Sequence, residues 1–282
     1  MGYIGVKPNY GEKSWLKGKE KEIKDQIILK AKELGACAAG VASVEALKNS
    51  PSYIIYGKIG DYKTVANKEG PIAPGQVEWP PDAKSAIVVA VEHSGAKPEL
   101  DWWIESYKGG TPGNRKLIDI NDRLALWLEN ETGINIKRLP YHIEHGGILL
   151  KDAAILAGLG CLGKNNMLVT PEHGPRVRLR AMFTDVVLPS SGPIGFDPCR
   201  GCDMLCRSAC PQNAFKQKIF SEKEFGIDQL PARSGVFSRP VCNRQMVLDE
   251  NQDERIKIEG EAESRKTVKY CRLCEFSCPV GQ

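Results

Sequence analysis

Two short segments of the chain concentrate its cysteines. The first, CRGCDMLCRSACP, begins at Cys199 and ends with Cys210 followed by Pro211. The second, YCRLCEFSCPVGQ, begins at Tyr270 and repeats the pattern, again with a proline after its last cysteine. Eight of the ten cysteines lie after residue 198. Thiols in a reducing compartment do not persist as disulfides, so this clustering predicts metal binding.

The spacing of these thiols predicts two [4Fe–4S] clusters. In two-cluster ferredoxins the last cysteine of each run, the one before proline, ligates the other cluster. Such crossed ligation gives two sets of four that use all eight thiolates: Cys199, Cys202, Cys206 and Cys278 for cluster one, and Cys210, Cys242, Cys271 and Cys274 for cluster two. Structural zinc is the alternative, because four-cysteine zinc sites also use C-x2-C, although they do not need paired Cys-Pro endings. The second gap of the first run is one residue longer than in the usual ferredoxin run.

The bulk composition is that of an ordinary globular protein. Of the 282 residues 41% are apolar and 26% charged, and the net charge is +4. A charge this small permits an acidic partner but gives no argument for nucleic acid. No apolar run reaches the roughly 18 residues that a membrane helix needs. The N-terminal segment also lacks a secretory signal and a twin-arginine pair. The sequence therefore predicts a cytoplasmic protein without membrane segments.

Helix and strand patterns alternate along the first two thirds of the chain. Apolar periodicity predicts helices at 20–35, 115–133 and 148–158, strands at 36–43, 85–93, 134–140, 167–170 and 177–188, and loops over 50–82. This alternation predicts an α+β domain over 1–190, and the Pro- and Gly-rich stretch at 190–198 places a boundary before a second domain at 191–282. The charged stretch 249–266 predicts a solvated loop or short helix.

Some residues outside the cysteine groups are expected to have structural rather than functional roles. Arg176, Arg178 and Arg180 alternate along a predicted strand and share one face, which predicts a solvated face. Cys37 falls in a predicted buried strand and is expected to be a small core residue. Two clusters alone need only about 60 to 80 residues, the size of a small domain, so the preceding part of the chain is expected to bind or reduce something else.

One block resembles the core of the epoxyqueuosine reductase and reductive dehalogenase superfamily. The block is AGLGCLGKNNMLVTPEHGPRVRLRAMFTDVVL at 157–188, followed by the two cysteine groups, and KELGACAAGVAS at 32–43 resembles the superfamily's opening helix and strand. The resemblance covers 20–282. It implies a nitroreductase-like α/β domain and a ferredoxin-like segment, with a corrinoid (cobalamin or another cobamide) held between them. It also implies that a ferredoxin or flavodoxin donates electrons through the clusters to the cobalt.

The glycine-rich turn within this block supplies the candidate cofactor residues. Gly158, Gly160 and Gly163 would let the backbone approach a large planar ligand closely. Hydrogen-bond donors to the corrinoid would come from Lys164, Asn165 and Asn166. The alternative for this group is an ordinary helix-to-strand turn with solvated polar side chains. Cys161 either faces the corrinoid pocket or is an inert packed thiol.

The candidate catalytic residues precede the glycine-rich turn. The resemblance places Glu144 at the position of the epoxyqueuosine reductases' acidic aspartate, with one methylene more. Reductive dehalogenases use a tyrosine with a basic partner, and Tyr141, His142 and His145 lie near enough in sequence to compete for that role. A carboxylate or imidazole in an apolar pocket suits general acid work. The alternative is a polar loop between a strand and a helix.

Taken together, these features predict a cytoplasmic iron–sulfur, corrinoid-dependent reductase of a small-molecule substrate. The chain ends three residues after Pro279, without the C-terminal helical region of full-length epoxyqueuosine reductases, so transfer RNA is expected to be an unlikely partner. The missing twin-arginine pair speaks against an exported dehalogenase. Two alternatives stay open: a corrinoid-free electron-transfer protein, and a reductive activator of another corrinoid protein.

Overall fold

An antiparallel four-stranded sheet forms the centre of the protein. The structure is a computed structural model that describes residues 17–58, 70–257 and 263–282. The strands β1 (Ala38–Ser43), β2 (Ser85–Glu92), β7 (Val177–Thr184) and β4 (Ile136–Arg138) lie side by side in the order β1-β2-β7-β4, and each neighbouring pair is antiparallel. Mixed helices and strands around an antiparallel sheet agree with the coarse α+β prediction.

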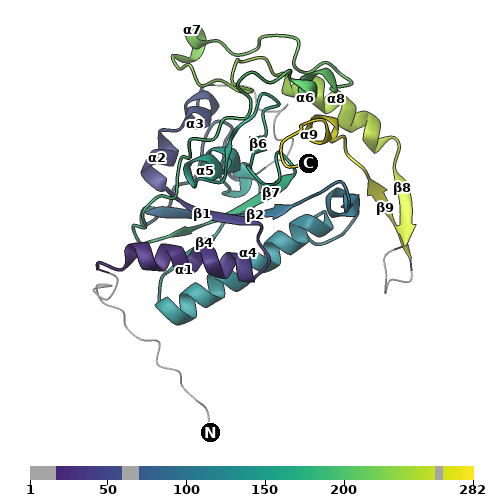
Figure 1. Cartoon of the computed structure of the whole chain (residues 1–282). Coiled ribbons are helices and arrows are strands. Elements are labelled where there is room, and N and C mark those ends of the chain that lie inside the picture. The colour runs from purple at the N-terminus through teal and green to yellow at the C-terminus, as the bar shows by residue number, and fades with distance from the viewer. Residues whose placement is uncertain (1–16, 59–69, 258–262) are drawn as a thin grey trace.

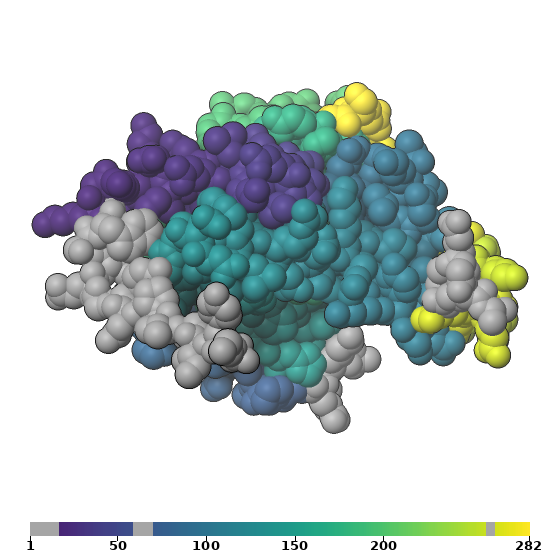
Figure 2. Space-filling model, turned by 90° about the horizontal axis from the view of Figure 1, so that it is seen from below, coloured from purple at the N-terminus to yellow at the C-terminus, as the bar shows by residue number. Residues whose placement is uncertain are grey.

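Helices cover both faces of this sheet (Figure 1). Ile87, Val89 and Val91 of β2 pack toward α1 (Glu20–Glu33) and α4 (Pro112–Thr132), while its alternate residues pack toward α5 (Leu150–Leu156) and α2 (Val44–Lys48). Successive side chains of a strand point to opposite faces. Because both faces of β2 are buried, its sequence is a nearly continuous apolar run. Figure 2, seen from below, shows α1 and α4 covering one face, with the cysteine-bearing segment visible only along the edges.

Local capping explains where several helices begin and end. Helix α4 begins earlier than the predicted 115–133 because the Thr111 hydroxyl accepts a hydrogen bond from the Asn114 N–H and Pro112 occupies the first turn. The helix ends at Gly133, whose φ of 63° is left-handed. The prediction of loops over 50–82 is wrong at its start, because α3 spans Pro51–Tyr56 with a proline in its first turn.

The cysteine-bearing part of the chain is built from short elements: α6 (Leu205–Ser208), α7 (Glu222–Phe225), α8 (Arg239–Glu250), β8 (Glu254–Lys257), β9 (Ser264–Val268) and α9 (Leu273–Phe276). Helices α6, α8 and α9 lie on the side of the sheet that α5 covers (Figure 1). Strand β9 pairs with β8 and also with β3 (Trp103–Ile104), so a second sheet joins this part to the first.

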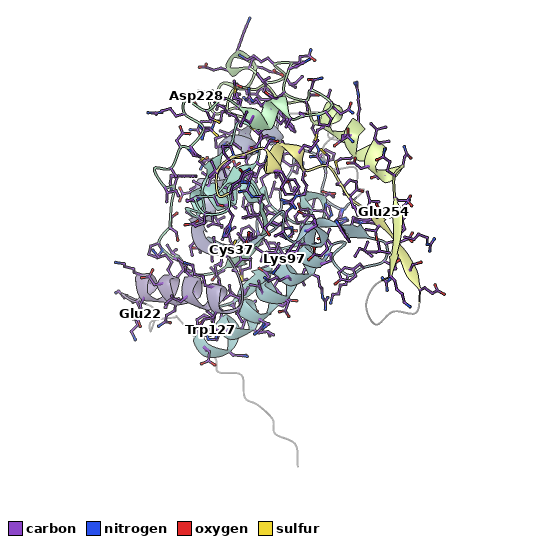
Figure 3. The ribbon with its side chains drawn as sticks, turned by 45° about the vertical axis from the view of Figure 1, so that its right-hand side comes forward. Glu22, Cys37, Lys97, Trp127, Asp228 and Glu254 are labelled. Atoms are coloured by element: carbon purple, nitrogen blue, oxygen red, sulfur yellow. The ribbon has the colours of Figure 1, made fainter. Side chains whose placement is uncertain are left out.

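The charged stretch 249–266 differs from its prediction. It carries β8 and the start of β9 rather than only a solvated loop or short helix. Glu254 of β8 lies on the outside of the molecule, far from Glu22 of α1 and Trp127 of α4 (Figure 3). Its side chain pairs with Lys269, 2.6 Å away. The strand pairing with β3 supplies order that the charged composition does not indicate.

No helix among the described residues is long and apolar enough to cross a bilayer. The remaining regular elements are short. They are the 3-10 turns η2 (Pro98–Asp101) and η3 (Ile143–His145) and the two-stranded ribbon of β5 (Cys161–Leu162) and β6 (Leu168–Val169). The ribbon begins directly after Gly160 and has Gly163 between its two strands, and η3 carries Glu144.

Candidate metal and substrate site

The structure brings the first predicted set of four cysteines together. Cys199, Cys202, Cys206 and Cys278 line one small cavity of about 30 Å³, which we call the first cysteine cavity. Burial, and after it the neighbouring thiols of Cys278, Cys199 and Cys202, raise the pKa of the Cys206 thiol to about 11. Three of these cysteines come from one loop and the fourth from a segment more than seventy residues later, as crossed ligation requires.

The second predicted set lines a separate cavity of about 470 Å³, the second cysteine cavity, whose walls include Cys210, Cys242, Cys271 and Cys274. Burial is the largest cause that raises the pKa of the Cys274 thiol, to about 12. The nearby side chains of Glu275, Cys242 and Cys271 contribute to the same increase. Cys206 also acts on this thiol, since α6 and α9 are in contact. In the described ranges no three His, Cys, Asp or Glu side chains are close enough to hold a single metal ion.

Two residues of the glycine-rich segment hold the cysteine loops. Lys164 and Asn165 both line the first cysteine cavity. The Asn165 amide donates to the carbonyl oxygen of Cys274 at 3.2 Å, and the Lys164 ammonium donates to that of Cys202 at 3.4 Å. Both side chains therefore position the loops that carry the thiols. The corrinoid contacts expected of them stay a prediction.

Three arginines contradict the prediction of a solvated face: Arg178 and Arg180 of β7, and Arg176 directly before the strand. Arg176 is only 6% exposed and donates to the backbone carbonyls of Glu275, Cys278 and Val280, at 3.2, 3.2 and 2.6 Å. The C-terminal segment packs over this end of β7, which the local sequence cannot indicate. Arg180 is partly buried and donates to the carbonyl oxygen of Leu139 at 3.3 Å.

Arg178 belongs to a network of charges between the sheet and α9. Its guanidinium pairs with Asp101 at 3.0 Å and Glu275 at 2.9 Å, and Arg272 pairs with the same two carboxylates at 2.7 and 2.8 Å. Nδ1 of the fully buried His93 lies 2.8 Å from Asp101. The pKa of Asp101 is lowered although burial opposes this, because His93 and both arginines stabilise the carboxylate.

A large cavity of about 700 Å³ lies beside the second cysteine cavity. Its walls come from α3, α5, η3 and the segment that leads into α8. The two cavities share five wall residues: Tyr141, Lys151, Asn166, Phe237 and Arg239. A group bound in the large cavity would thus lie next to residues that also face the second set of thiols.

The three predicted catalytic residues all line the large cavity. Glu144 is 7% exposed, and its Oε1 has no hydrogen-bond partner among the described residues. Nδ1 of His142 lies 3.6 Å from this oxygen. Tyr141 is 46% exposed, and its ring meets the His142 ring edge-on with centroids 5.2 Å apart. The arrangement places a buried carboxylate beside a polar cavity wall, as a proton donor requires.

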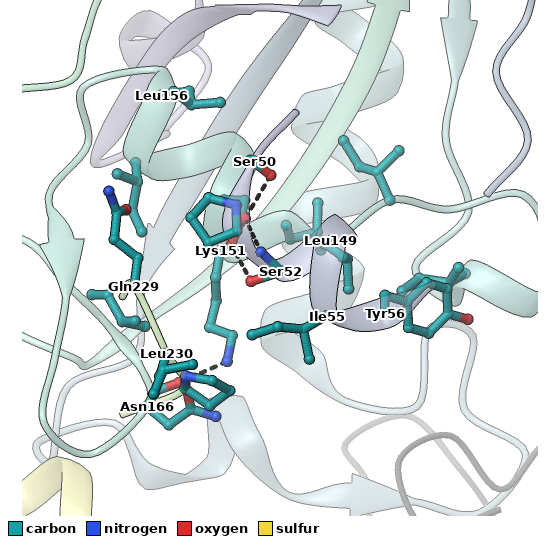
Figure 4. A pocket seen from close by; sticks show the side chains of 18 of the residues that line it. Ser50, Ser52, Ile55, Tyr56, Leu149, Lys151, Leu156, Asn166, Gln229 and Leu230 are labelled. Carbon is teal, nitrogen blue, oxygen red and sulfur yellow. Dashed lines mark hydrogen bonds between the residues drawn. The ribbon is translucent and has the colours of Figure 1, made fainter. Parts of the chain in front are cut away.

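Lys151 is a site residue that our sequence-based candidates missed. Its side chain reaches across the large cavity and donates to the carbonyl oxygen of Asn166 at 2.8 Å (Figure 4). Burial lowers the pKa of Lys151 to about 8. The adjacent Asp152 offers its carboxylate elsewhere, to Ser50 and Ser52 at 2.6 and 2.5 Å. The sequence feature that could have indicated this residue is that Lys151 and Asp152 are two adjacent charged residues within an otherwise apolar stretch.

The three glycines of the turn are packed against the protein itself. A side chain on Gly158 would come within 2.6 Å of the Ser191 carbonyl oxygen, and one on Gly160 would overlap the backbone of Val169. A side chain on Gly163 would meet Asn165 at 2.5 Å. The described fold thus needs these glycines for its own close packing. None of them lines the large cavity, so their contact with a corrinoid stays a prediction.

Cys161 lies beside Arg233, whose Nη2 is 3.3 Å from the sulfur. Burial raises the pKa of the Cys161 thiol. The residue is absent from the walls of the large cavity, although its neighbour Leu162 lines them. A role in the corrinoid pocket therefore remains a prediction, as does the packed-thiol alternative.

Known proteins share both sequence and fold with this chain. No protein-family profile matches it. The epoxyqueuosine reductase of Synechocystis sp. is 30% identical over 244 residues, which cover 84% of this chain and 75% of the relative. The solved epoxyqueuosine reductase of Streptococcus thermophilus is similar with a TM-score of 0.58 at 19% identity over 92% of this chain, which spans 66% of that enzyme. A catabolic reductive dehalogenase has a TM-score of 0.59 at 16% identity, over 94% of this chain and 32% of its own.

These relatives overturn one prediction about partners. The sequence predicted that transfer RNA is an unlikely partner, because the chain ends soon after Pro279. Several curated relatives are epoxyqueuosine reductases, and one solved enzyme of this fold, with a TM-score of 0.55, holds an epoxyqueuosine-modified tRNA stem loop. The end of the chain is therefore no basis for excluding transfer RNA.

The resemblance based on 157–188 and the cysteine groups is confirmed by these relatives. Sequence identity carries the assignment for the Synechocystis enzyme, and the solved structures add the fold. The chain therefore belongs to the epoxyqueuosine reductase and reductive dehalogenase superfamily.

Proposed function

We propose that the protein is a corrinoid-dependent reductase that draws electrons through two [4Fe–4S] clusters. One observation carries the proposal: eight cysteines from separate segments line two cavities in two sets of four, and the second cavity adjoins the large cavity that contains Glu144. The order of the cavities supports a direction for electron transfer, from the two sets of thiols, through the wall that the second cysteine cavity shares with the large cavity, to the site of Glu144. The domain boundary at 190 is kept as part of this proposal.

The thiols suit iron–sulfur clusters for a physical reason. Iron binds thiolates, whereas burial raises the pKa of Cys206 and Cys274 and so favours their thiol forms in the apoprotein. A cluster's positive iron would reverse this preference. The backbone carbonyls of Cys202, Cys274 and Cys278 are held by Lys164, Asn165 and Arg176. These contacts keep the loops in place around the two cavities.

The large cavity and the second cysteine cavity together suit a large cofactor that has both apolar and polar groups. Their volumes are about 700 and 470 Å³, and they meet along a common wall. Aromatic and aliphatic residues such as Phe237 and Leu162 line the walls, with a few polar groups such as Asn166, as is usual for cofactor sites. A solved reductive dehalogenase of this fold, with a TM-score of 0.50, is described as B12-dependent. A bound cobamide would supply a strongly reducing, nucleophilic metal centre.

Glu144 is the proposed proton donor to the substrate. It lies in η3 and is one of the residues that line the large cavity, one of its carboxylate oxygens is buried without a hydrogen-bond partner among the described residues, and His142 lies near enough to orient it. Another solved epoxyqueuosine reductase, with a TM-score of 0.55, is described with a catalytic aspartate loop swung out of its active site. The substrate proposed first is epoxyqueuosine, free or in transfer RNA, because the curated relatives act on it by name. A ferredoxin or flavodoxin in the cytoplasm is the proposed electron donor.

Metal analysis of anaerobically purified protein tests the proposal. We expect about eight irons per chain, four for each cluster, and one cobalt after reconstitution with cobalamin, together with the visible absorption of both cofactors. Iron without cobalamin binding would instead favour a corrinoid-free electron carrier. Activation of a separate corrinoid protein, with no turnover of epoxyqueuosine or organohalides, would favour a reductive activator.

A further inference from the structure

Two cationic side chains meet where the large cavity and the second cysteine cavity join. Lys151 extends from α5 and Arg239 from the start of α8, and both line both cavities. Their charges interact: Arg239 disfavours the charged form of Lys151. Two positive groups held together beside a mostly apolar cavity repel each other unless a negative group lies between them.

No carboxylate neutralises either cation within the part of the chain that the structure describes. The Lys151 ammonium donates to the carbonyl oxygen of Asn166 at 2.8 Å and forms no ion pair. Arg239 has a buried Nε without a hydrogen-bond partner, its Nη2 contacts the sulfur of Met246 at 3.7 Å, and its charge acts on the thiol of Cys242 in the same cavity. A buried donor left unsatisfied costs about 1–3 kcal/mol, and more when the group is charged. An unpaired cationic pair of this kind is expected where a ligand supplies the missing acceptor.

The nearest carboxylate is not available to fill this role. Asp152 follows Lys151 in the chain and acts on its charge. Both Asp152 oxygens already accept hydrogen bonds, from the hydroxyls of Ser50 and Ser52 and from the Ser52 N–H. Those contacts direct the carboxylate toward the first turn of α3, while the Lys151 side chain extends the other way, toward Asn166 (Figure 4).

We propose that Lys151 and Arg239 bind an oxyanion of the substrate at this junction. The planar guanidinium can donate two parallel hydrogen bonds to a carboxylate or phosphate, and the ammonium adds a point charge on the same group. The pair would hold one end of the substrate while the rest lies in the large cavity beside Glu144. The inference rests on the proposed function only in assigning this cavity to the substrate.

Two sources share this chemistry. A phosphate would come from a nucleotide substrate, and a carboxylate from a small organic acid. Inorganic phosphate and benzoate are therefore the two probes, each measured by equilibrium dialysis against iron-loaded, cobalamin-free protein. The probe with the higher affinity identifies the source, and binding of neither at millimolar concentration overturns the proposal.

Substitutions then test the two cations. Lys151→Met and Arg239→Met should each weaken binding of the preferred probe at least tenfold, or about 1.4 kcal/mol. Arg239→Lys keeps the charge and should recover part of the loss. Arg244→Met is the matched control, because Arg244 is an exposed cation of the same helix, and it should change the affinity less than twofold. Equal affinities in the two Met variants and the wild-type protein, with cooperative unfolding that shows each variant to be folded, would overturn the proposal.

The pH dependence gives an independent readout. Binding should weaken as the pH rises through about 8, where Lys151 loses its proton, and this step should vanish in Lys151→Met. Asp152 on α5 and Arg239 on α8 act on the same ammonium, and Tyr141 and Glu144 line the large cavity with it. The thiols of the second cysteine cavity, which Lys151 also lines, are iron-bound in the protein used for the measurement. Glu144→Gln should therefore retain the step near pH 8. A step that persists without Lys151 contradicts the assignment.

Cobalamin affinity separates this inference from the proposed function. If the two cations bind the substrate, the double variant Lys151→Met/Arg239→Met should bind cobalamin with an affinity within twofold of that of the wild-type protein. A parallel tenfold loss of cobalamin would assign the pair to the cofactor and overturn the inference. Probe binding without any cobalamin binding would support the oxyanion site while removing the corrinoid from the proposed function.

Discussion

Arg178 of β7 and Glu275 of α9 form a two-point ion pair. Nη2 of the arginine lies 2.9 Å from Oε1 of the glutamate, and its Nη1 lies 3.2 Å from Oε2. The two side chains are only 21% and 7% exposed. They tie the central sheet to the helix that carries Cys274, so the position of the second cysteine set depends on the core of the first part of the chain.

Removal of the glutamate charge should destabilise the protein strongly. Glu275→Gln leaves Arg178 and Arg272 facing the single carboxylate of Asp101. Removing one partner of a buried ion pair costs about 3 kcal/mol or more. Thermal unfolding of anaerobic protein, at matched iron content, measures the change.

The exposed pair of Arg123 and Asp119 on α4 is the control. Its side chains are 57% and 60% exposed and lie 3.4 Å apart. Exposed pairs contribute at most about 1 kcal/mol, so Asp119→Asn should hardly shift the melting temperature. If Glu275→Gln and Asp119→Asn shift it equally, the buried network does not anchor α9 to the sheet.

Crossed ligation predicts which cluster each proline-linked cysteine supports. Cys278→Ser should disturb the cluster held mainly by the first run, because Cys278 shares a cavity with Cys199 and its neighbours. Cys210→Ser should disturb the other cluster. Iron analysis with electron paramagnetic resonance of the reduced protein distinguishes the two signals, and each variant should lose or alter about one cluster's four irons.

Cys37→Ser controls for the loss of a thiol as such. Cys37 is partly buried beside the central sheet, away from both cysteine cavities, and lies inside the fold (Figure 3). We expect full iron content and both signals in this variant. Crossed ligation fails if Cys278→Ser and Cys210→Ser each alter the signal assigned to their own run, or if native protein contains zinc in place of iron.

The sequence predicted those parts of the fold whose cause is local or periodic. Strand β2 was evident because its buried faces make an apolar run, and helix α4 because of its apolar spacing and Gly133. The two runs of closely spaced cysteines were also evident from the sequence, whereas their crossed ligation joins distant segments and stays a prediction. The strand, the helix and the cysteine runs need no knowledge of distant segments.

Features that depend on distant segments were missed for that reason. The pairing of β9 with β3 orders a charged stretch that composition assigns to solvent. The C-terminal segment buries Arg176, which looks exposed in a strand pattern. Lys151 belongs to the site only because the segments of Asn166 and Arg239 fold over it. In each case the deciding contact joins residues far apart in the chain.

Lys151 should cost the protein stability near neutral pH. Burial lowers its pKa from 10.5 to about 8. Between these values the unfolded chain holds a proton that the folded chain releases, so stability rises as the pH rises from 8 to 10.5. Lys151→Met should therefore stabilise the protein at pH 7 by about 2 kcal/mol, after a discount for the partial exposure of the side chain. Melting temperatures at pH 7 and pH 10 measure this.

The gain should shrink at pH 10, because the lysine is then neutral in the folded protein. Lys48→Met is a suitable comparison, since that lysine is exposed at the end of α2, and it should show little change at either pH. A Lys151→Met variant that is less stable than wild type at pH 7 would show that its hydrogen bond to Asn166 outweighs the burial of its charge.

Glu144 is the residue on which turnover should depend most specifically. Glu144 lines the large cavity, and its buried Oε1 has no hydrogen-bond partner among the described residues and lies 3.6 Å from Nδ1 of His142. Glu144→Gln keeps the size of the side chain and removes its acidic proton, so turnover should fall by about 10²-fold or more, the usual share of general acid catalysis. Iron content, cobalamin binding and melting temperature should stay unchanged.

The assay uses epoxyqueuosine nucleoside, a modified tRNA stem loop and a panel of organohalides. Glu45→Gln, an exposed carboxylate of α2, should retain full activity. Native turnover by Glu144→Gln on any accepted substrate would exclude Glu144 as the donor and make Tyr141 and His142 the next residues to replace.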